Sequence, residues 1–265
     1  MVSKRTLVKG ALAVAIAAVS VSAFATHSWN NYHWARTTSS FNLGVIDSTT
    51  PSWDSQTNAA VSQWSASSKM NLSVTSSDDT STTRRNCSAV LRKVRVCNYA
   101  YGSNGWLGLA SINLDSKGHI SQGTAKMNDS YASSFADVNE KYHVMCQEVG
   151  HTLGLGHTSE NGSTQNTCMD YSKSPTSTRP NQHDYDMLAS IYAHTDSYSS
   201  YSLAAAALTA SQLTASQKVM AGDTPVGVRV HKGRFEETWA APDGRGGLWI
   251  HHLTLAPGFE HLDVN

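Results

Sequence analysis

The chain has 265 residues, and its 20 Lys and Arg balance its 20 Asp and Glu, so the formal net charge is zero. No long run of one charge sign appears, which argues against nucleic-acid and membrane-surface binding, and we expect neither partner. Beyond the first residues, no segment approaches the roughly 20 apolar residues of a membrane-spanning helix.

The N-terminus has the pattern of a secretory signal. Lys4, Arg5 and Lys9 precede the apolar run "GALAVAIAAVSVSA", and the small residues "AFA" follow it. We predict a signal peptide over residues 1–25, cleaved after Ala25, rather than an uncleaved anchor, because the run is short and ends in a cleavage-site pattern. The mature protein is therefore expected to be secreted and extracellular.

The sequence contains four cysteines, at positions 87, 97, 146 and 168. An even number in an exported chain favours two disulfides, although four cysteines allow three pairings. We expect Cys87–Cys97 and Cys146–Cys168, because each pair closes a short loop. Metal binding by the cysteines is the competing interpretation, but the chain has no C-x-x-C pair.

Hydrophobic periodicity predicts alternating strands and helices over the first two thirds of the chain. In chain order we expect a strand within 33–47, a helix within 50–68, strands within 70–76 and 88–102, and two strands within 105–128 joined by the turn "DSKGH". The remaining length suits one domain plus a small addition. The predicted class is α+β, with a twisted mixed β-sheet.

A longer helix is predicted from near Phe135, with Val138, Tyr142, Met145 and Val149 as its apolar stripe. Gly154 is expected to end it, and a last helix is expected within 181–194. We predict a main domain over 26–200, an Ala-rich linker over 201–218 and a small β-rich tail over 219–265. This tail is expected either to bind a substrate or wall polymer, or to form a hairpin that covers a sheet edge.

The stretch "CQEVGHTLGLGH" has the spacing of a catalytic metal site. Gln147 and His151 are four residues apart, so they lie on the same helix face, with Glu148 beside them. A turn at Gly154 would bring His157 back toward the helix. Three groups then converge and leave a fourth position open, as a catalytic zinc requires, while Glu148 can accept a proton from water.

These residues resemble the metzincin pattern H-E-x-x-H-x-x-G-x-x-H at every defining position except the first, where Gln147 stands. Downstream, "CMDY" resembles the Met-turn of that clan, with Met169 as the residue below the metal. The strands "GLASINL" and "GTAKMN" resemble the edge strand and its neighbour in matrixins. The resemblance covers roughly residues 29 to 195.

The resemblance implies a matrixin-like catalytic domain and a secreted zinc endopeptidase acting on protein or peptide substrates. It implies Glu148 as the general base and His151 and His157 as zinc ligands, with the weaker amide oxygen of Gln147 as the third. Tyr171 matches the Met-x-Tyr spacing of astacins and serralysins, whose tyrosine can reach the metal. A tyrosine packed below the site is the alternative.

One departure from the family pattern keeps a second function open. Because of Gln147, the chain is alternatively a catalytically inactive metzincin-fold protein that binds peptides or surface polymers in the former cleft. His143 cannot replace the missing ligand, because it lies about 12 Å along the helix axis from His151. We expect it to be an ordinary, partly exposed histidine.

The remaining candidates are weaker. Asp115 and His119 suit a structural calcium or zinc ion, although a turn at Gly118 explains them more simply. The tail histidines show no recognisable ligand spacing: His231, His251, His252 and His261. We expect a monomer.

Overall fold

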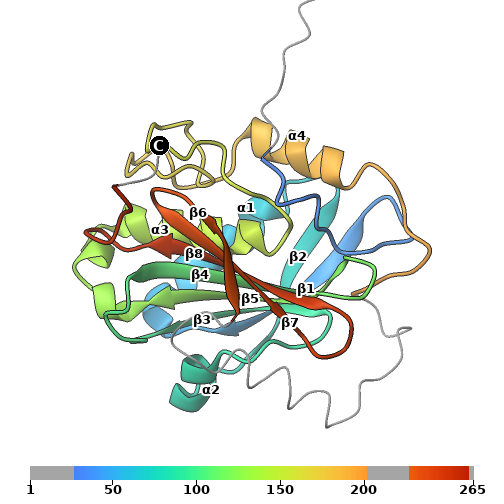
Figure 1. The fold of residues 1–265 in the computed structure, drawn as a ribbon, viewed down its shortest axis with the longest axis horizontal. Coiled ribbons are helices and arrows are strands. Elements are labelled where there is room, and N and C mark those ends of the chain that lie inside the picture. The colour runs from blue at the N-terminus through green and yellow to red at the C-terminus, as the bar shows by residue number, and fades with distance from the viewer. Residues whose placement is uncertain (1–26, 202–226, 263–265) are drawn as a thin grey trace, which may run out of the picture.

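A computed structural model describes residues 27–201 and 227–262, which fold around one eight-stranded mixed sheet (Figure 1). The predicted signal peptide and all of the predicted linker except Tyr201 lie outside the described residues. Within the described part, no helix has the length and apolar character needed to cross a membrane. The predicted α+β class with a mixed sheet is confirmed.

The strand order in the sheet is β2-β1-β3-β5-β4-β8-β7-β6. The first four strands in this order pair in parallel, and the pairs from β5–β4 onward are antiparallel. The bounds are β1 Phe41–Ser48, β2 Met70–Ser77, β3 Lys93–Tyr99, β4 Trp106–Leu114, β5 Ile120–Asn128, β6 Val228–Lys232, β7 Glu236–Pro242 and β8 Leu248–Leu255.

Four α-helices accompany the sheet in the described residues: α1 Asp54–Trp64, α2 Ser81–Asn86, α3 Val138–His151 and α4 Gln182–Ile191. Helices α1 and α3 pack against each other, and the fully buried Trp64 donates its indole N–H to the Cys146 carbonyl oxygen at 3.0 Å. The largest core cluster continues from these helices to β1 and β3 through apolar side chains such as Leu43 and Val94.

Both predicted disulfides, Cys87–Cys97 and Cys146–Cys168, are present. Helix α2 and strand β7 were not predicted. The sequence "STTRRN" of α2 has no apolar stripe, and this short helix begins after Thr80, whose side chain caps it. Strand β7, "EETWAAP", begins with two glutamates and therefore lacks the alternation that marks a strand.

Two predictions about α3 were wrong. Val138 is 53% exposed rather than part of the buried stripe, because the helix starts there, capped by the Asp137 side chain. His143 is buried rather than partly exposed.

The tail strands extend the main sheet, so β4 is not an edge strand as the resemblance implied. Strand β8 pairs antiparallel with β4 along its length, from Trp106–Leu255 to Leu114–Leu248. Figure 1 shows the three tail strands, in red, crossing beside β4. The edge is covered because "GGLWIHHLTL" supplies a long strand with six consecutive buried residues in its middle. The tail therefore reaches the region of α3.

Candidate metal centre

The end of α3 turns as the sequence predicted. The helix ends at His151, and Gly154 has φ +100°, a conformation that favours glycine. A side chain at Gly154 would meet the Tyr32 carbonyl oxygen at 1.9 Å, and Trp29 donates its backbone N–H to the Gly154 oxygen at 2.7 Å. The N-terminal segment therefore packs directly on the turn that returns His157 to the helix.

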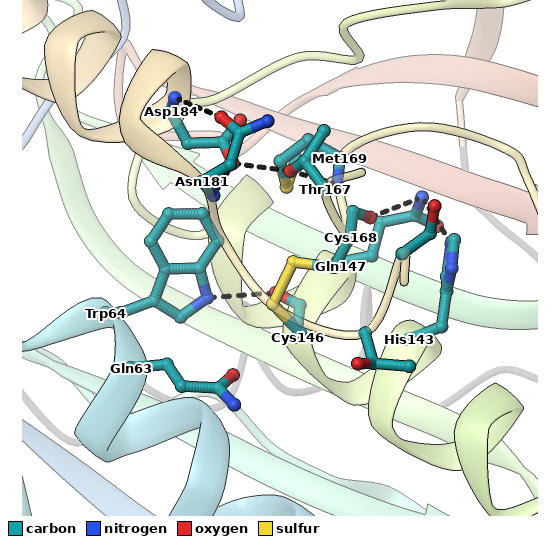
Figure 2. The surroundings of a disulfide bond; sticks show 12 residues. Gln63, Trp64, His143, Cys146, Gln147, Thr167, Cys168, Met169, Asn181 and Asp184 are labelled. Atoms are coloured by element: carbon teal, nitrogen blue, oxygen red, sulfur yellow. Dashed lines mark hydrogen bonds between the residues drawn. A yellow bond between two sulfur atoms is a disulfide. The ribbon is translucent and has the colours of Figure 1, made fainter. Parts of the chain in front are cut away.

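Met169 lies beneath this turn. A Cβ atom at Gly150 would stand 2.6 Å from the Met169 sulfur, so the methionine packs against the helix backbone one residue before His151. The Cys146–Cys168 disulfide links the same helix to the residue before Met169 (Figure 2). The helix and the methionine loop are thus held together by packing and by a covalent bond.

Three histidines converge above Met169. The Nε2 atoms of His151 and His157 are 3.2 Å apart. The ring of His252, from β8, lies 4.0 Å from the ring of His151 and 4.7 Å from that of His157. One ring nitrogen of each histidine lies within 4.8 Å of the others, which is a spacing that a metal ion can bridge.

The hydrogen bonds fix the protons on two of these rings. His151 Nδ1 donates to the Leu155 carbonyl oxygen at 2.8 Å, which can only accept. His157 Nδ1 donates to the Glu236 carboxylate at 2.9 Å. In their neutral forms, both histidines therefore direct lone pairs on Nε2 at each other. Two facing lone pairs repel, and a cation between them removes that repulsion.

His252 completes the same pattern. Its Nε2 atom is bonded to Glu236. Its Nδ1 atom is buried and has no hydrogen-bond partner among the described residues. Metal-binding histidines typically donate their other ring N–H to a carboxylate or carbonyl oxygen. By this test the three rings fit a zinc ion as ligands.

Burial keeps the His151 and His157 rings neutral, which is the form of imidazole that binds metal. Burial lowers the pKa of His157 to about 4, against the opposing effect of Glu236. Burial, then His252 and His157, lower the pKa of His151 well below its usual value. Burial alone would raise the pKa of Glu236, but His157 and His252 hold it well below its usual range. The site therefore places the neutral imidazoles of His151 and His157 beside an ionised carboxylate.

Gln147 is engaged elsewhere. Its amide Nε2 donates to the carbonyl oxygens of Cys168 at 3.0 Å and Asp170 at 2.8 Å, and its Oε1 accepts from the Thr254 hydroxyl at 2.8 Å. Figure 2 shows the side chain beside the disulfide and directed at the methionine loop. In this arrangement Gln147 joins α3 to that loop and to β8.

Glu148 is fully buried between α3 and the sheet. Its Oε1 accepts from the Thr254 hydroxyl at 2.7 Å, and its Oε2 has no partner among the described residues. A Cβ atom at Gly108 of β4 would stand 2.2 Å from Oε1, so glycine leaves the room that the carboxyl group needs. Burial raises the pKa of Glu148 to about 7.

Tyr171 contacts both His157 and Glu236. Its hydroxyl donates to Glu236 at 2.6 Å and lies 2.8 Å from His157 Nδ1. Burial, with Glu236 next in effect, raises the Tyr171 pKa well above its usual value, so the hydroxyl keeps its proton. It helps to orient Glu236 and His157.

A cleft of about 390 Å³ reaches the histidines from outside. His157 and His252 line it together with Trp29 of the N-terminal segment and Val230 and His231 of β6. Glu148 is not among its lining residues. The cleft gives a small molecule or a peptide side chain access to the metal-binding nitrogens, and Glu148 lies behind them.

Sequence reasoning missed His252 and Glu236. Both lie in the tail, about a hundred residues from the motif in the chain, and no local spacing connects them to it. The available signal was chemical: the motif lacked one histidine, and the tail carried an adjacent pair between apolar residues. No known family model matches the chain, and no curated protein matches its sequence.

Proposed function

We propose that this protein is a secreted zinc-dependent hydrolase of the metzincin type, with zinc held by His151, His157 and His252. The support is the arrangement of ring protons. Each histidine has one ring nitrogen hydrogen-bonded to a protein acceptor. One nitrogen of each ring lies within 4.8 Å of the others. In this proposal a histidine from β8 takes the place of the motif's missing first ligand.

The protein groups have separate tasks in the reaction. A bound zinc ion supplies Lewis acidity and lowers the pKa of water. Glu236 holds His157 and His252 through hydrogen bonds to their outer nitrogens. Glu148 is the general base, whose carboxylate takes the proton of water and passes it to the leaving group. Thr254 orients that carboxylate by donating to Oε1.

The proposed substrate is a protein or peptide, as the metzincin resemblance implies. An extended peptide cannot add to β4, because β8 already occupies that edge. The cleft between the N-terminal segment and β6 offers the other approach, lined by Trp29 and Val230. We propose that the substrate enters there.

One observation favours a second function. Glu148 is fully buried, and Thr254 of β8 covers its Oε1. A zinc ion with three protein ligands and no working base would only fasten β8 to α3. The chain would then be a non-catalytic member of the fold that binds peptides or surface polymers.

Hydrolysis of casein by the purified full chain with added zinc separates the two functions. Glu148→Gln keeps the size of the side chain and removes its basicity, so we expect activity to fall by at least ~10²-fold with zinc content unchanged. Glu140→Gln, on the same helix but in its first turn, is the matched control and should retain activity. Equal rates for wild type and Glu148→Gln would reject the enzyme and favour the binding protein.

Secretion is part of the proposal. It rests on the signal-like N-terminus and on two disulfides, which persist in oxidising compartments. Mass spectrometry of the exported protein should find Thr26 as the first residue. An intact N-terminus would contradict the predicted cleavage.

A further inference from the structure

We propose a second metal site, distinct from the first, in which His33, His119, His194 and Asp196 bind one zinc-like divalent ion. The four residues come from three separate segments. His33 precedes β1, His119 ends the β4–β5 turn, and the other two follow α4. The site does not depend on the proposed hydrolase function.

The distances match the edges of a coordination tetrahedron. Four ligands about 2.0–2.1 Å from a zinc ion lie about 3.3 Å from one another. Asp196 Oδ1 is 3.3 Å from His119 Nε2 and 3.5 Å from His194 Nε2. The Nε2 atoms of His194 and His33 are 3.2 Å apart. Three of the six edges are therefore at about the required length. One donor atom each of His33, His194 and Asp196 lies within 4.8 Å of the others, and His119 joins this group through its contact with Asp196.

In the neutral rings of His33 and His119, the hydrogen bond at Nδ1 again leaves a lone pair on Nε2. Both lone pairs face the Asp196 carboxylate, which cannot donate. His33 Nδ1 donates to the Asn31 carbonyl oxygen at 2.8 Å, so its neutral ring has a lone pair on Nε2. That atom lies 3.6 Å from Asp196 Oδ2. Since a carboxylate only accepts, the contact becomes favourable when a cation, either a metal ion or a proton, stands between these atoms.

His119 shows the same arrangement through a relay. Its Nδ1 lies 2.8 Å from the Tyr198 hydroxyl, which in turn donates to the Asp115 carboxylate. Because the hydroxyl donates its hydrogen bond to Asp115, its oxygen accepts from His119 Nδ1–H, and the Nε2 lone pair faces Asp196 at 3.3 Å. Such outer partners are typical of metal-binding histidines.

A proton on one ring is the competing explanation. Burial and the neighbouring His33 lower the pKa of His119, which makes a shared proton less favourable. Burial would raise the pKa of Asp196, but the Arg36 backbone N–H and the three histidines lower it, so the carboxylate stays ionised. Imidazole nitrogens around an ionised carboxylate oxygen form the donor set of a metal site.

The donor set selects the kind of metal. Three imidazole nitrogens and one carboxylate oxygen suit zinc and similar transition metals, whereas calcium takes six to eight oxygen ligands. Of the two ions considered for Asp115 and His119, the arrangement favours zinc. His119 serves as a ligand and Asp115 as its outer partner. Protein atoms at all four positions are typical of a structural site.

A metal ion bound here would connect three segments: the N-terminal segment, the β4–β5 turn and the segment after α4. The Ile120 backbone N–H donates to the His33 carbonyl oxygen at 2.8 Å, so the N-terminal segment already contacts β5 here. The Asp196 backbone N–H donates to the Arg36 carbonyl oxygen, and the Arg36 backbone N–H donates to the Asp196 carboxylate. The ion would lock these contacts, and Trp29, which lines the cleft, lies on the same N-terminal segment.

Zinc content of the purified full chain, measured by mass spectrometry after dialysis against buffered zinc, tests this site. We expect two zinc ions per chain in the wild type and one in His194→Ala, whose side chain is 54% exposed and is replaceable without a core cavity. His252→Phe should lose the other ion. His261→Ala, a partly buried histidine outside both clusters, should retain both.

Substitutions of Asp196 and Asp115 distinguish a metal ligand from a residue that only hydrogen-bonds to the residues around the metal. Asp196→Asn should weaken this site by more than 100-fold, and Asp115→Asn by the ~10–100-fold typical of an outer partner. Cobalt should bind with the intense visible absorption of a tetrahedral site, and that absorption should vanish in Asp196→Asn. One zinc ion per wild-type chain, retained by His194→Ala and lost by His252→Phe, would overturn this proposal and leave the hydrolase proposal intact.

Discussion

His252 of β8 stacks on His151 of α3 with ring centroids 4.0 Å apart. This contact joins the last described strand to the helix that carries the metzincin-like motif. It also explains how a chain with Gln147 in place of the first histidine still brings three imidazoles together. Strand β8 therefore extends the sheet along β4 and, in the proposed metal centre, also supplies a ligand.

Gln147 is predicted to matter for stability and not for metal binding. Gln147→Ala would leave the Cys168 and Asp170 carbonyl oxygens without their buried partner and would remove one of the two acceptors of the Thr254 hydroxyl. We expect the free energy of unfolding to fall by about 3 kcal/mol, measured by urea denaturation. Zinc affinity of the folded variant should stay within about threefold of wild type. A tenfold or larger loss would make Gln147 a ligand.

Sequence reasoning located the helix, the turn at Gly154, Met169 and two of the three histidines, because these lie within one short stretch and obey helical spacing. The role of Gln147 could not be read in the same way. Spacing places its side chain on the correct face but does not decide which acceptors it will find. Its amide nitrogen donates to the carbonyl oxygens of Cys168 and Asp170. The path of that loop depends on the Cys146–Cys168 disulfide.

The position of His252 in this cluster could not be predicted from the sequence for a related reason. The pairing of β8 with β4 is a long-range contact, and nothing in "IHHL" specifies which of two adjacent histidines faces α3. The α+β class, the disulfide pairing and most elements of the first 200 residues followed from local patterns. The continuation of the sheet into the tail depended on tertiary contacts alone.

The Cys146–Cys168 disulfide should matter more to the metal centre than the other one. Both should contribute about 3 kcal/mol to stability by restricting the unfolded chain. Only Cys146–Cys168 connects α3 to the residue before Met169. We therefore expect the double Ser variant of this pair to weaken zinc binding at the His252 site at least tenfold, measured by competition with a chelator. The double Ser variant of Cys87 and Cys97 is the control, and equal effects would refute the prediction.

His27 should make the fold sensitive to acid. Burial lowers its pKa to about 4, with the Gly156 hydrogen bond opposing and His183 adding to the effect. Because the folded pKa lies below the unfolded value of 6.5, the unfolded chain binds more protons below pH 6.5. Stability is therefore fully present above pH 6.5 and is lost as the pH falls toward 4. Burial also raises the pKa of nearby Asp184 to about 6, so through most of this range it carries no charge to stabilise an imidazolium.

The comparison is between wild type and His27→Gln, in which the other titrating groups are common to both proteins. Between pH 7.5 and 4.5, the wild type should lose on the order of 2 kcal/mol more unfolding free energy than the variant. Urea denaturation at each pH measures this difference. Parallel curves for the two proteins would show that His27 does not titrate in this way.

The most direct test of the whole account is zinc affinity in two neighbouring variants of β8. His252→Phe keeps a ring against His151 but cannot bind metal. His251→Phe alters the adjacent buried histidine, whose Nδ1 bonds to Ser111 at 2.8 Å. With the second site removed by His194→Ala in both backgrounds, we predict that His252→Phe abolishes zinc binding and that His251→Phe preserves it. Undiminished zinc binding by folded His252→Phe would contradict the central claim.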